Sequence, residues 1–192
     1  MEKTACLLAV VLSGCFAELQ FRIDDCNKDK QLLHVDRYDV TPYPPIIPGD
    51  VTASGHLTLG RNISGNLQLD VSIYKKALFW FPVPCIANVG SCSYNFCDLL
   101  NSAFVRDGTT KCPRQMSKQN LPCTCPFQSG SYTLNPDVWT IRALPSTLSW
   151  LLTGDYKIDA SLVNKETGEQ IGCIHMEITL EHPCSGLACI FG

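Results

Sequence analysis

Residues 67–73 read LQLDVSI, a strict alternation of apolar and polar residues. Successive side chains of a β-strand point to opposite faces, so this stretch predicts a strand with one buried and one solvated face. The same alternation returns at 156–162 and at 174–180, and weaker versions occur at 32–40, 51–59 and 77–83. Turn signals such as Pro48-Gly49-Asp50 separate these stretches. Many short antiparallel strands predict an all-β fold, either a two-sheet sandwich or an open barrel.

One segment departs from the strand pattern. Apolar residues recur at helical spacing from Phe96 to Phe104, which predicts a short helix near residues 93–104. The following stretch, 106–127, is rich in proline and cysteine. We expect it to be a loop held together by disulfides.

The chain opens with a short apolar leader. Residues 1–17 combine Lys3, an apolar run at 5–12 and small residues up to Ala17, as in a cleavable signal peptide. A bacterial lipoprotein signal, with Cys15 as the lipidated residue, is the alternative. No later stretch reaches the roughly 20 apolar residues that span a bilayer. Residues 18–192 suit a single domain with a short C-terminal tail at 181–192, in a secreted or lysosomal protein.

The charge balance is mildly acidic. The formal net charge is −3, which argues against nucleic acid as a partner, because nucleic-acid binding favours a clustered basic face. With a sequence pI near 5.7, the protein becomes net positive in an acidic lysosome. Attraction to anionic membrane surfaces then replaces weak repulsion.

The cysteines predict disulfides. The chain has 12, of which Cys6 and Cys15 lie in the leader and six fall between Cys85 and Cys125. Thiols oxidise in secreted proteins, and the neighbours Cys123 and Cys125 are too close for an easy mutual bridge, so each pairs elsewhere. A zinc site that joins Cys92-x4-Cys97 to Cys123-x-Cys125 is the alternative. Its spacing matches no common zinc pattern.

The sequence contains no pattern typical of catalysis. The histidines His34, His56, His175 and His182 are scattered, and we expect them to be satisfied surface residues. There is no Gly-x-Ser-x-Gly elbow and no phosphate-binding glycine loop. We therefore expect a protein that is not an enzyme and that uses no cofactor or metal.

Two aromatic-rich segments, 78–83 and 138–152, are candidates for ligand contact. Core packing explains part of their character, but a loop with two tryptophans is also apolar enough to line a cleft or enter a membrane interface. Lys75 and Lys76 precede the first segment and could meet lipid head groups. Asn62-Ile63-Ser64 is a sequon that predicts glycosylation at Asn62.

Taken together, these residues resemble the ML (MD-2-related lipid-recognition) family from about Cys26 to Leu180. The matching pieces are Asp25-Cys26, 47–52, Trp80 with Cys85, 90–92, 96–98, 121–127, Gly130 with Tyr132, 149–156 and 172–174. So many short matches in one order are specific. The tail 181–192 and the position of the Asn62 sequon depart from the family's pattern.

The resemblance implies an immunoglobulin-like two-sheet β-sandwich, or β-cup, with an internal apolar cavity for lipid tails. It also implies a set of bridges, namely Cys26–Cys173, Cys85–Cys92, Cys97–Cys125 and Cys112–Cys123. In the additional tail, Cys184 and Cys189 could bridge each other.

For function, the resemblance implies a non-enzymatic protein that contacts a membrane transiently, extracts a ganglioside-like glycosphingolipid and presents it to a lysosomal β-hexosaminidase. We expect the cavity and its rim to be formed by Phe79, Trp80, Phe81, Trp139, Ile141, Leu144, Leu148, Trp150, Leu151, Leu152 and Tyr156. Two alternatives remain open. One is a carrier or sensor of another lipid, such as a sterol, a phospholipid or a microbial lipid. The other is a structural or inhibitory protein whose interior is filled by side chains.

Overall fold

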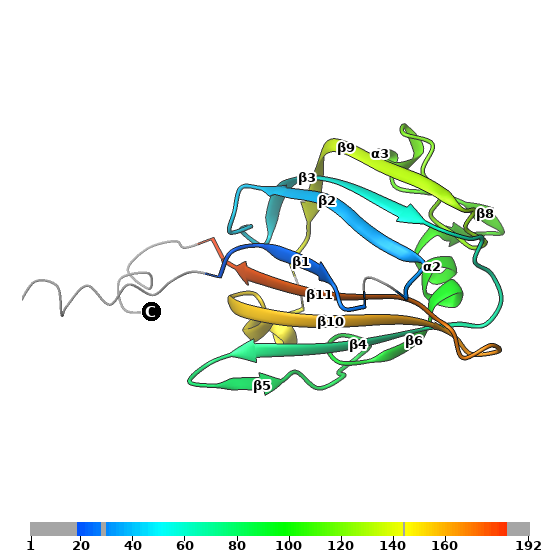
Figure 1. Ribbon diagram of the computed structural model, residues 1–192. Helices are drawn as coiled ribbons and strands as arrows, with labels where there is room; N and C mark the ends of the chain where they lie inside the picture. Colours follow the sequence, from blue (N-terminus) through cyan, green and yellow to red (C-terminus); the bar gives the residue numbers. More distant parts are fainter. Residues whose placement is uncertain (1–18, 28–29, 144, 184–192) are drawn as a thin grey trace, which may run out of the picture.

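Two antiparallel β-sheets face each other in the computed structural model, which describes residues 19–27, 30–143 and 145–183 (Figure 1). Sheet A contains, in spatial order, β1 (Arg22–Asp25), β11 (Gln170–Leu180), β10 (Gly154–Asn164), β4 (Leu67–Lys76) and β5 (Trp80–Pro82), and β6 (Ser93–Asn95) also pairs with β4. Sheet B contains β2 (Leu33–Thr41), β3 (Gly49–Leu59) and β9 (Gly130–Ile141). The prediction of an all-β two-sheet sandwich is confirmed.

The three strictly alternating stretches form the adjacent strands β4, β10 and β11. Ile158 lies opposite Ile73 on one side and Met176 on the other. The next residue, Asp159, lies opposite Ser72 and His175. Because neighbours in register point to the same side, the apolar members share the inner face of sheet A and the polar members share its outer face.

The two sheets approach each other along one edge, where β2 runs past β1 and β11 (Figure 1). Leu32 N donates to Ile171 O at 2.8 Å across this edge. The approach is close, since a Cβ at Gly172 would lie 3.0 Å from the Leu33 Cβ. Glycine at this position therefore allows the two sheets to join.

The helical segment is shorter than predicted. The helix α2 spans Phe96–Phe104 and begins after Asn95, whose side chain accepts a hydrogen bond from Asp98 N at 3.1 Å. The predicted first turn, 93–95, instead pairs with β4 as β6. The proline- and cysteine-rich stretch predicted as a loop contains most of the hairpin of β7 (Val105–Arg106) and β8 (Thr109–Thr110). It also contains the single turn α3 (Arg114–Ser117).

The structure corrects the prediction for Trp139, which lies in strand β9 and not in a loop. Pro136 hides this strand in the sequence, because proline cannot donate to a β-ladder. The strand tolerates it for two reasons. β9 is an edge strand, and its pairing with β3 shifts register between Ala53 and Gly55, opposite the segment that contains Pro136. The other tryptophan of the predicted loop, Trp150, lies in the 3₁₀ helix η1 (Ser146–Leu151).

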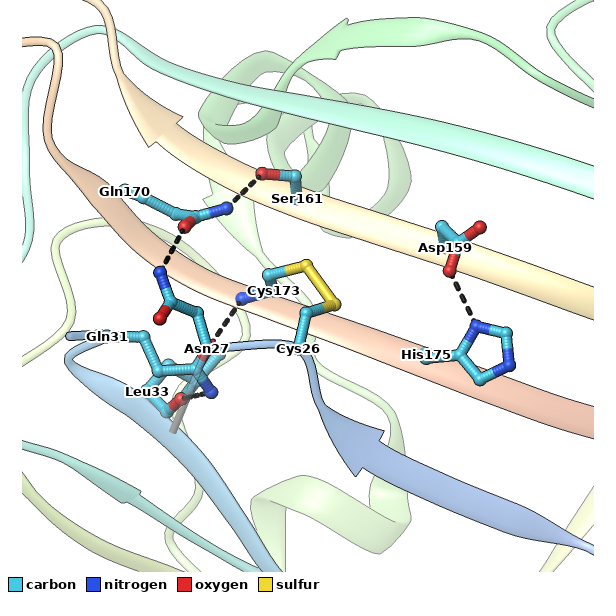
Figure 2. Close-up of a disulfide and its surroundings, with 9 residues drawn as sticks. All are labelled: Cys26, Asn27, Gln31, Leu33, Asp159, Ser161, Gln170, Cys173 and His175. Carbon is cyan, nitrogen blue, oxygen red and sulfur yellow. Dashed lines mark hydrogen bonds and ion pairs between the residues drawn. A yellow bond between two sulfur atoms is a disulfide. The ribbon is translucent and has the colours of Figure 1, made fainter. Parts of the chain in front are cut away.

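The structure contains the four bridges that the resemblance implies, Cys26–Cys173, Cys85–Cys92, Cys97–Cys125 and Cys112–Cys123. Figure 2 shows Cys26–Cys173 joining the residue after β1 to a position near the start of β11. Next to it, Cys173 N donates to the Gln31 side chain at 3.1 Å. The cysteines of the alternative zinc site are therefore engaged in disulfides.

Three sequence predictions lie outside the described residues: the signal peptide 1–17, the Cys184–Cys189 pair and Leu144. Over the ranges that the structure does describe, no helix is both long enough and apolar enough to cross a bilayer.

Candidate functional site

An apolar cavity of about 230 Å³ lies between the sheets, next to α2. It is lined by Leu33, Leu57, Leu59, Ile63, Phe96, Met116, Leu121, Pro122, Phe127, Tyr132 and Leu162. The Tyr132 hydroxyl is already engaged, because it donates a hydrogen bond to Gln128 O. The lining therefore consists of hydrocarbon, aromatic and thioether groups, and it offers apolar contact without directional polar anchors.

Disulfides hold the outer wall of this cavity. Cys97–Cys125 ties α2 to the chain just before Phe127, and Cys112–Cys123 closes the loop that carries Met116 and Leu121. Phe127 N donates to Ile63 O at 3.0 Å, and Ile63 N donates to Phe127 O at 2.9 Å. These links fix loop side chains against the strands, so the cavity is bounded by covalently restrained walls.

A second apolar cluster lies away from this cavity and comprises Val83, Leu148, Leu151 and Tyr156. Tyr156 is 3% exposed, and its hydroxyl donates to Leu151 O at 2.9 Å. Burial raises the pKa of this phenol, so the hydroxyl stays a donor at any physiological pH. Strand β10 therefore holds η1 in place at this end.

Inner-face side chains between the two clusters are only partly buried. Val71, Ile73, Ile158 and Met176 all retain some solvent exposure, although they lie on the inner face of sheet A. Interiors of ordinary domains are close-packed, with few voids larger than a water molecule. The interior of this sandwich is therefore less completely filled than a typical core.

The predicted lipid-contact residues fall into separate groups. Leu148, Leu151, Leu152 and Tyr156 are buried. Trp150 is 39% exposed, although it lies in the same 3₁₀ helix as Leu148 and Leu151. Trp139 lies opposite buried Val51 on sheet B, and its indole nitrogen is buried without a hydrogen-bond partner among the described residues. Ile141, two residues further along β9, points to the same side and is partly buried.

The remaining three predicted residues, Phe79, Trp80 and Phe81, lie at different places in the β4–β5 hairpin. Phe79, at its tip, is 73% exposed beside Leu78, which is 99% exposed. Phe81 lies opposite Lys75 and shares its face, whereas Trp80 lies opposite Lys76 on the outer face. There the Lys157 ammonium lies 4.8 Å from the centroid of the Trp80 ring.

None of the described members of this predicted set lines the apolar cavity. Their role in lipid contact stays a prediction, and the cavity adds residues that the sequence reading missed. Leu57, Leu59 and Leu162 were detectable as apolar positions of alternating strands. Met116, Leu121 and Phe127 come from a loop without periodicity, so no sequence signal indicated that they face inward.

The outer face of sheet A carries a cross-strand charge network. Nδ1 of His175 lies 2.6 Å from Asp159, and Nε2 lies 3.5 Å from Glu177 (Figure 2 shows the contact with Asp159). Lys157 pairs with Glu177 at 3.1 Å. The hydrogen bond to Asp159 raises the pKa of His175, and the hydrogen bond from Lys157 lowers the pKa of Glu177.

We expect His175→Gln to remove part of the stability at acidic pH. A raised pKa in the folded state means that the contribution is fully present below the unfolded value near 6.5 and is lost as pH rises through the folded value. Because the pair is near the surface, the difference at pH 5 should be about 1 kcal/mol or less. Urea unfolding of both proteins at pH 5 and pH 8 measures it. A deficit that is as large at pH 8 as at pH 5 would contradict the expectation, and exposed His182→Gln is the control.

Two facing sheets around an apolar cavity, with four disulfides among the described residues, define a recognisable class. The chain belongs to the ML domain family, whose sequence profile matches residues 20–180. Among its relatives, the ganglioside GM2 activator of Mus musculus is 32% identical over 188 residues, covering 91% of this chain and 95% of that protein. The ganglioside GM2 activator of Macaca fascicularis is 32% identical over 163 residues, covering 84% and 83%.

Solved structures are also similar to this chain. A Niemann-Pick type C2 protein from Japanese carpenter ant aligns with a TM-score of 0.37 and 14% identity, covering 84% of this chain and 100% of that chain. Chicken MD-1 complexed with lipid IVa aligns with a TM-score of 0.41 and 14% identity, covering 83% and 88%.

Proposed function

We propose that this protein is a non-enzymatic lipid carrier that extracts a ganglioside-like glycolipid from a membrane and presents it to a lysosomal β-hexosaminidase. The observation that carries the proposal is the inter-sheet cavity, whose lining offers no free polar group. The relatives named ganglioside GM2 activator, 32% identical over most of both chains, support the choice of lipid.

The energetics suit this role. Each buried methylene is worth about 0.8 kcal/mol, so exposing an 18-carbon tail to water costs about 14 kcal/mol. A carrier must therefore replace the apolar environment of the bilayer with another. The cavity of about 230 Å³ is smaller than the roughly 300–1,000 Å³ typical of ligand pockets. We infer that a bound lipid widens the sandwich and that its tails extend past the partly buried Ile73, Ile158 and Met176.

A membrane-contact region is part of the proposal. Leu78 and Phe79 protrude at the tip of the β4–β5 hairpin, and Lys76 lies beside them. The Lys75 ammonium donates to Trp150 O, which places exposed Trp150 next to the same hairpin. Large apolar side chains this exposed mark a contact surface, and tryptophan is favoured at the membrane interface. We propose that these residues meet the bilayer surface while the lipid transfers.

We propose that Asn62 of the sequon carries a glycan. Asn62 is exposed, and its side-chain oxygen accepts from Ser129 N at 2.7 Å, which leaves the amide nitrogen open for a glycan. Glycosylation there fits the proposed route through the secretory pathway to the lysosome or outside the cell.

The first experiment is extraction of labelled ganglioside GM2, a sterol and a phospholipid from liposomes at pH 5 and pH 7. Selective extraction of the glycolipid supports the proposal and leads to an assay of β-hexosaminidase stimulation. Extraction of sterol or phospholipid alone moves the function to another carrier role. Extraction of no lipid overturns the carrier function.

A cavity-filling variant tests where the tails bind. Leu57→Trp adds a large ring to the cavity wall, and we expect lipid extraction to fall roughly tenfold or more, since tenfold corresponds to only about 1.4 kcal/mol. Val138→Trp adds the same ring at an exposed position on β9 and should leave extraction unchanged. Circular dichroism confirms that both variants fold. Unchanged extraction by a folded Leu57→Trp protein would show that the tails bind elsewhere.

A further inference from the structure

Lys75 is a cation at one end of the largely apolar inner face of sheet A. It lies opposite Tyr156 of β10 and opposite Phe81 of β5, so its side chain starts on the same side of sheet A as both aromatic residues. Ile73, two residues earlier on the same strand, packs against the cluster of Tyr156 and Val83. The neighbouring Lys76 faces the other way. The position of Lys75 therefore differs from that of an ordinary surface lysine.

The surroundings of Lys75 hold its ammonium at the edge of this cluster. The Nζ atom donates to Trp150 O and lies 5.8 Å from the Trp150 ring centroid and 5.5 Å from that of Tyr156. Its Cε would lie 3.1 Å from a Cβ at position 154, where the chain has Gly154 with a φ of +114°. A glycine thus leaves room for the lysine to lie across the start of β10.

This ammonium lacks an anionic partner within the described ranges. Lys76 pairs with Asp155 at 3.3 Å, whereas no described carboxylate lies within ion-pair distance of Lys75. Partial burial alone lowers the pKa of Lys75. An ammonium has three N–H donors, and one carbonyl with two ring faces satisfies it only in part. A partly desolvated cation with donors to spare favours the approach of a negatively charged group.

We propose that Lys75 anchors the carried lipid by binding a negatively charged group of its head group, a carboxylate or a phosphate. The inference rests on the proposed carrier function and deepens it. Lys75 lies between the exposed apolar tip formed by Leu78 and Phe79 and the inner face of the sandwich. A lipid with its tails inside and its head outside would place its first polar groups at this level. The anion replaces Trp150 O as the partner of the ammonium.

The test compares lipids that differ only in charge. Liposome extraction is measured for ganglioside GM2 and its asialo form, and separately for phosphatidylglycerol and phosphatidylcholine. We expect the wild-type protein to extract the anionic member of at least one pair about tenfold better. Lys75→Met should lose this preference and retain extraction of the neutral member. The pair that shows the effect distinguishes a carboxylate from a phosphate.

Matched variants keep the result interpretable. Lys165→Met removes an exposed charge from the turn between β10 and β11 and should keep the preference, as should Lys75→Arg, which retains the cation. Equal extraction of both members of each pair by the wild-type protein overturns the anchor alone. A preference that survives in Lys75→Met also overturns it, and loss of the preference in Lys165→Met reduces the effect to overall charge. If the wild-type protein extracts none of the four lipids, the carrier function itself fails.

Discussion

Replacing both Cys26 and Cys173 by alanine is expected to lower the free energy of unfolding by about 5 kcal/mol in the chain-entropy model. The two residues are 147 positions apart, so the bridge restricts most of the unfolded chain. Domains are stable by only about 5–15 kcal/mol, so the loss takes a large share of the total. Urea unfolding followed by tryptophan fluorescence measures it, and double replacement avoids a free thiol.

The Cys85–Cys92 bridge supplies the internal control. It closes a separation of only 7 residues, and the same model assigns it about 2 kcal/mol. If both double variants lose the same stability, loop entropy is not what the long bridge contributes, and local strain or packing must account for the loss. If losing the long bridge costs about twice as much stability, restriction of the unfolded chain accounts for its contribution.

Leu67→Ala is expected to destabilise the protein by about 3 kcal/mol, within the 2–5 kcal/mol range of buried leucine truncations. Leu67 is 0% exposed and belongs to the apolar cluster with Leu59, Ile63 and Leu162. The truncation removes three heavy atoms and leaves a void that rigid neighbours fill only in part. Ser72→Ala, at an exposed position of the same strand, should change stability by less than about 0.5 kcal/mol. Comparable losses for the two variants would contradict the assignment of the core.

Leu67 also connects stability to the proposed site. Three of its four cluster partners, Leu59, Ile63 and Leu162, line the apolar cavity, whereas Ile171 and Leu67 itself do not. The cavity wall is therefore also part of the folding core of this protein. Leu67→Ala should therefore loosen the packing of the cavity wall. Its lipid extraction is compared with that of the wild-type protein at a temperature where both remain folded.

The strands of sheet A were predictable because their signal is local. Alternation over 67–73 depends only on neighbouring residues, and register then aligns like with like across β4, β10 and β11. The start of α2 was not predictable at the level of a few residues. Residues 93–95 can join either the helix or β4, and it is pairing with β4 that decides. Strand β9 was not predicted, because Pro136 is compatible with a strand only at a sheet edge with a register shift.

The candidate site shows a sharper limit. The segment 78–83 is apolar on nearly every position, so alternation assigns Trp80 and Phe81 to opposite faces without saying which face is inside. The pairing of β5 with β4 decides which face is inside, and it places Trp80 next to Lys157 on the outer face of sheet A. The same pairing turns Lys75 inward, toward Tyr156. The sequence pattern alone does not indicate that Lys75 faces inward.

By itself, the sequence of this protein determined the strand-forming stretches, the cysteine framework and the membership of the ML domain family, because alternation and motif spacing are properties of short segments. Only the tertiary structure decided where the apolar cavity lies, which tryptophans face outward and that Lys75 lacks a carboxylate partner within the described residues. Burial and pairing depend on which distant segments meet. Leu57, Phe127 and Leu162 are far apart along the chain, and they share one cavity because the sheets and disulfides bring them together.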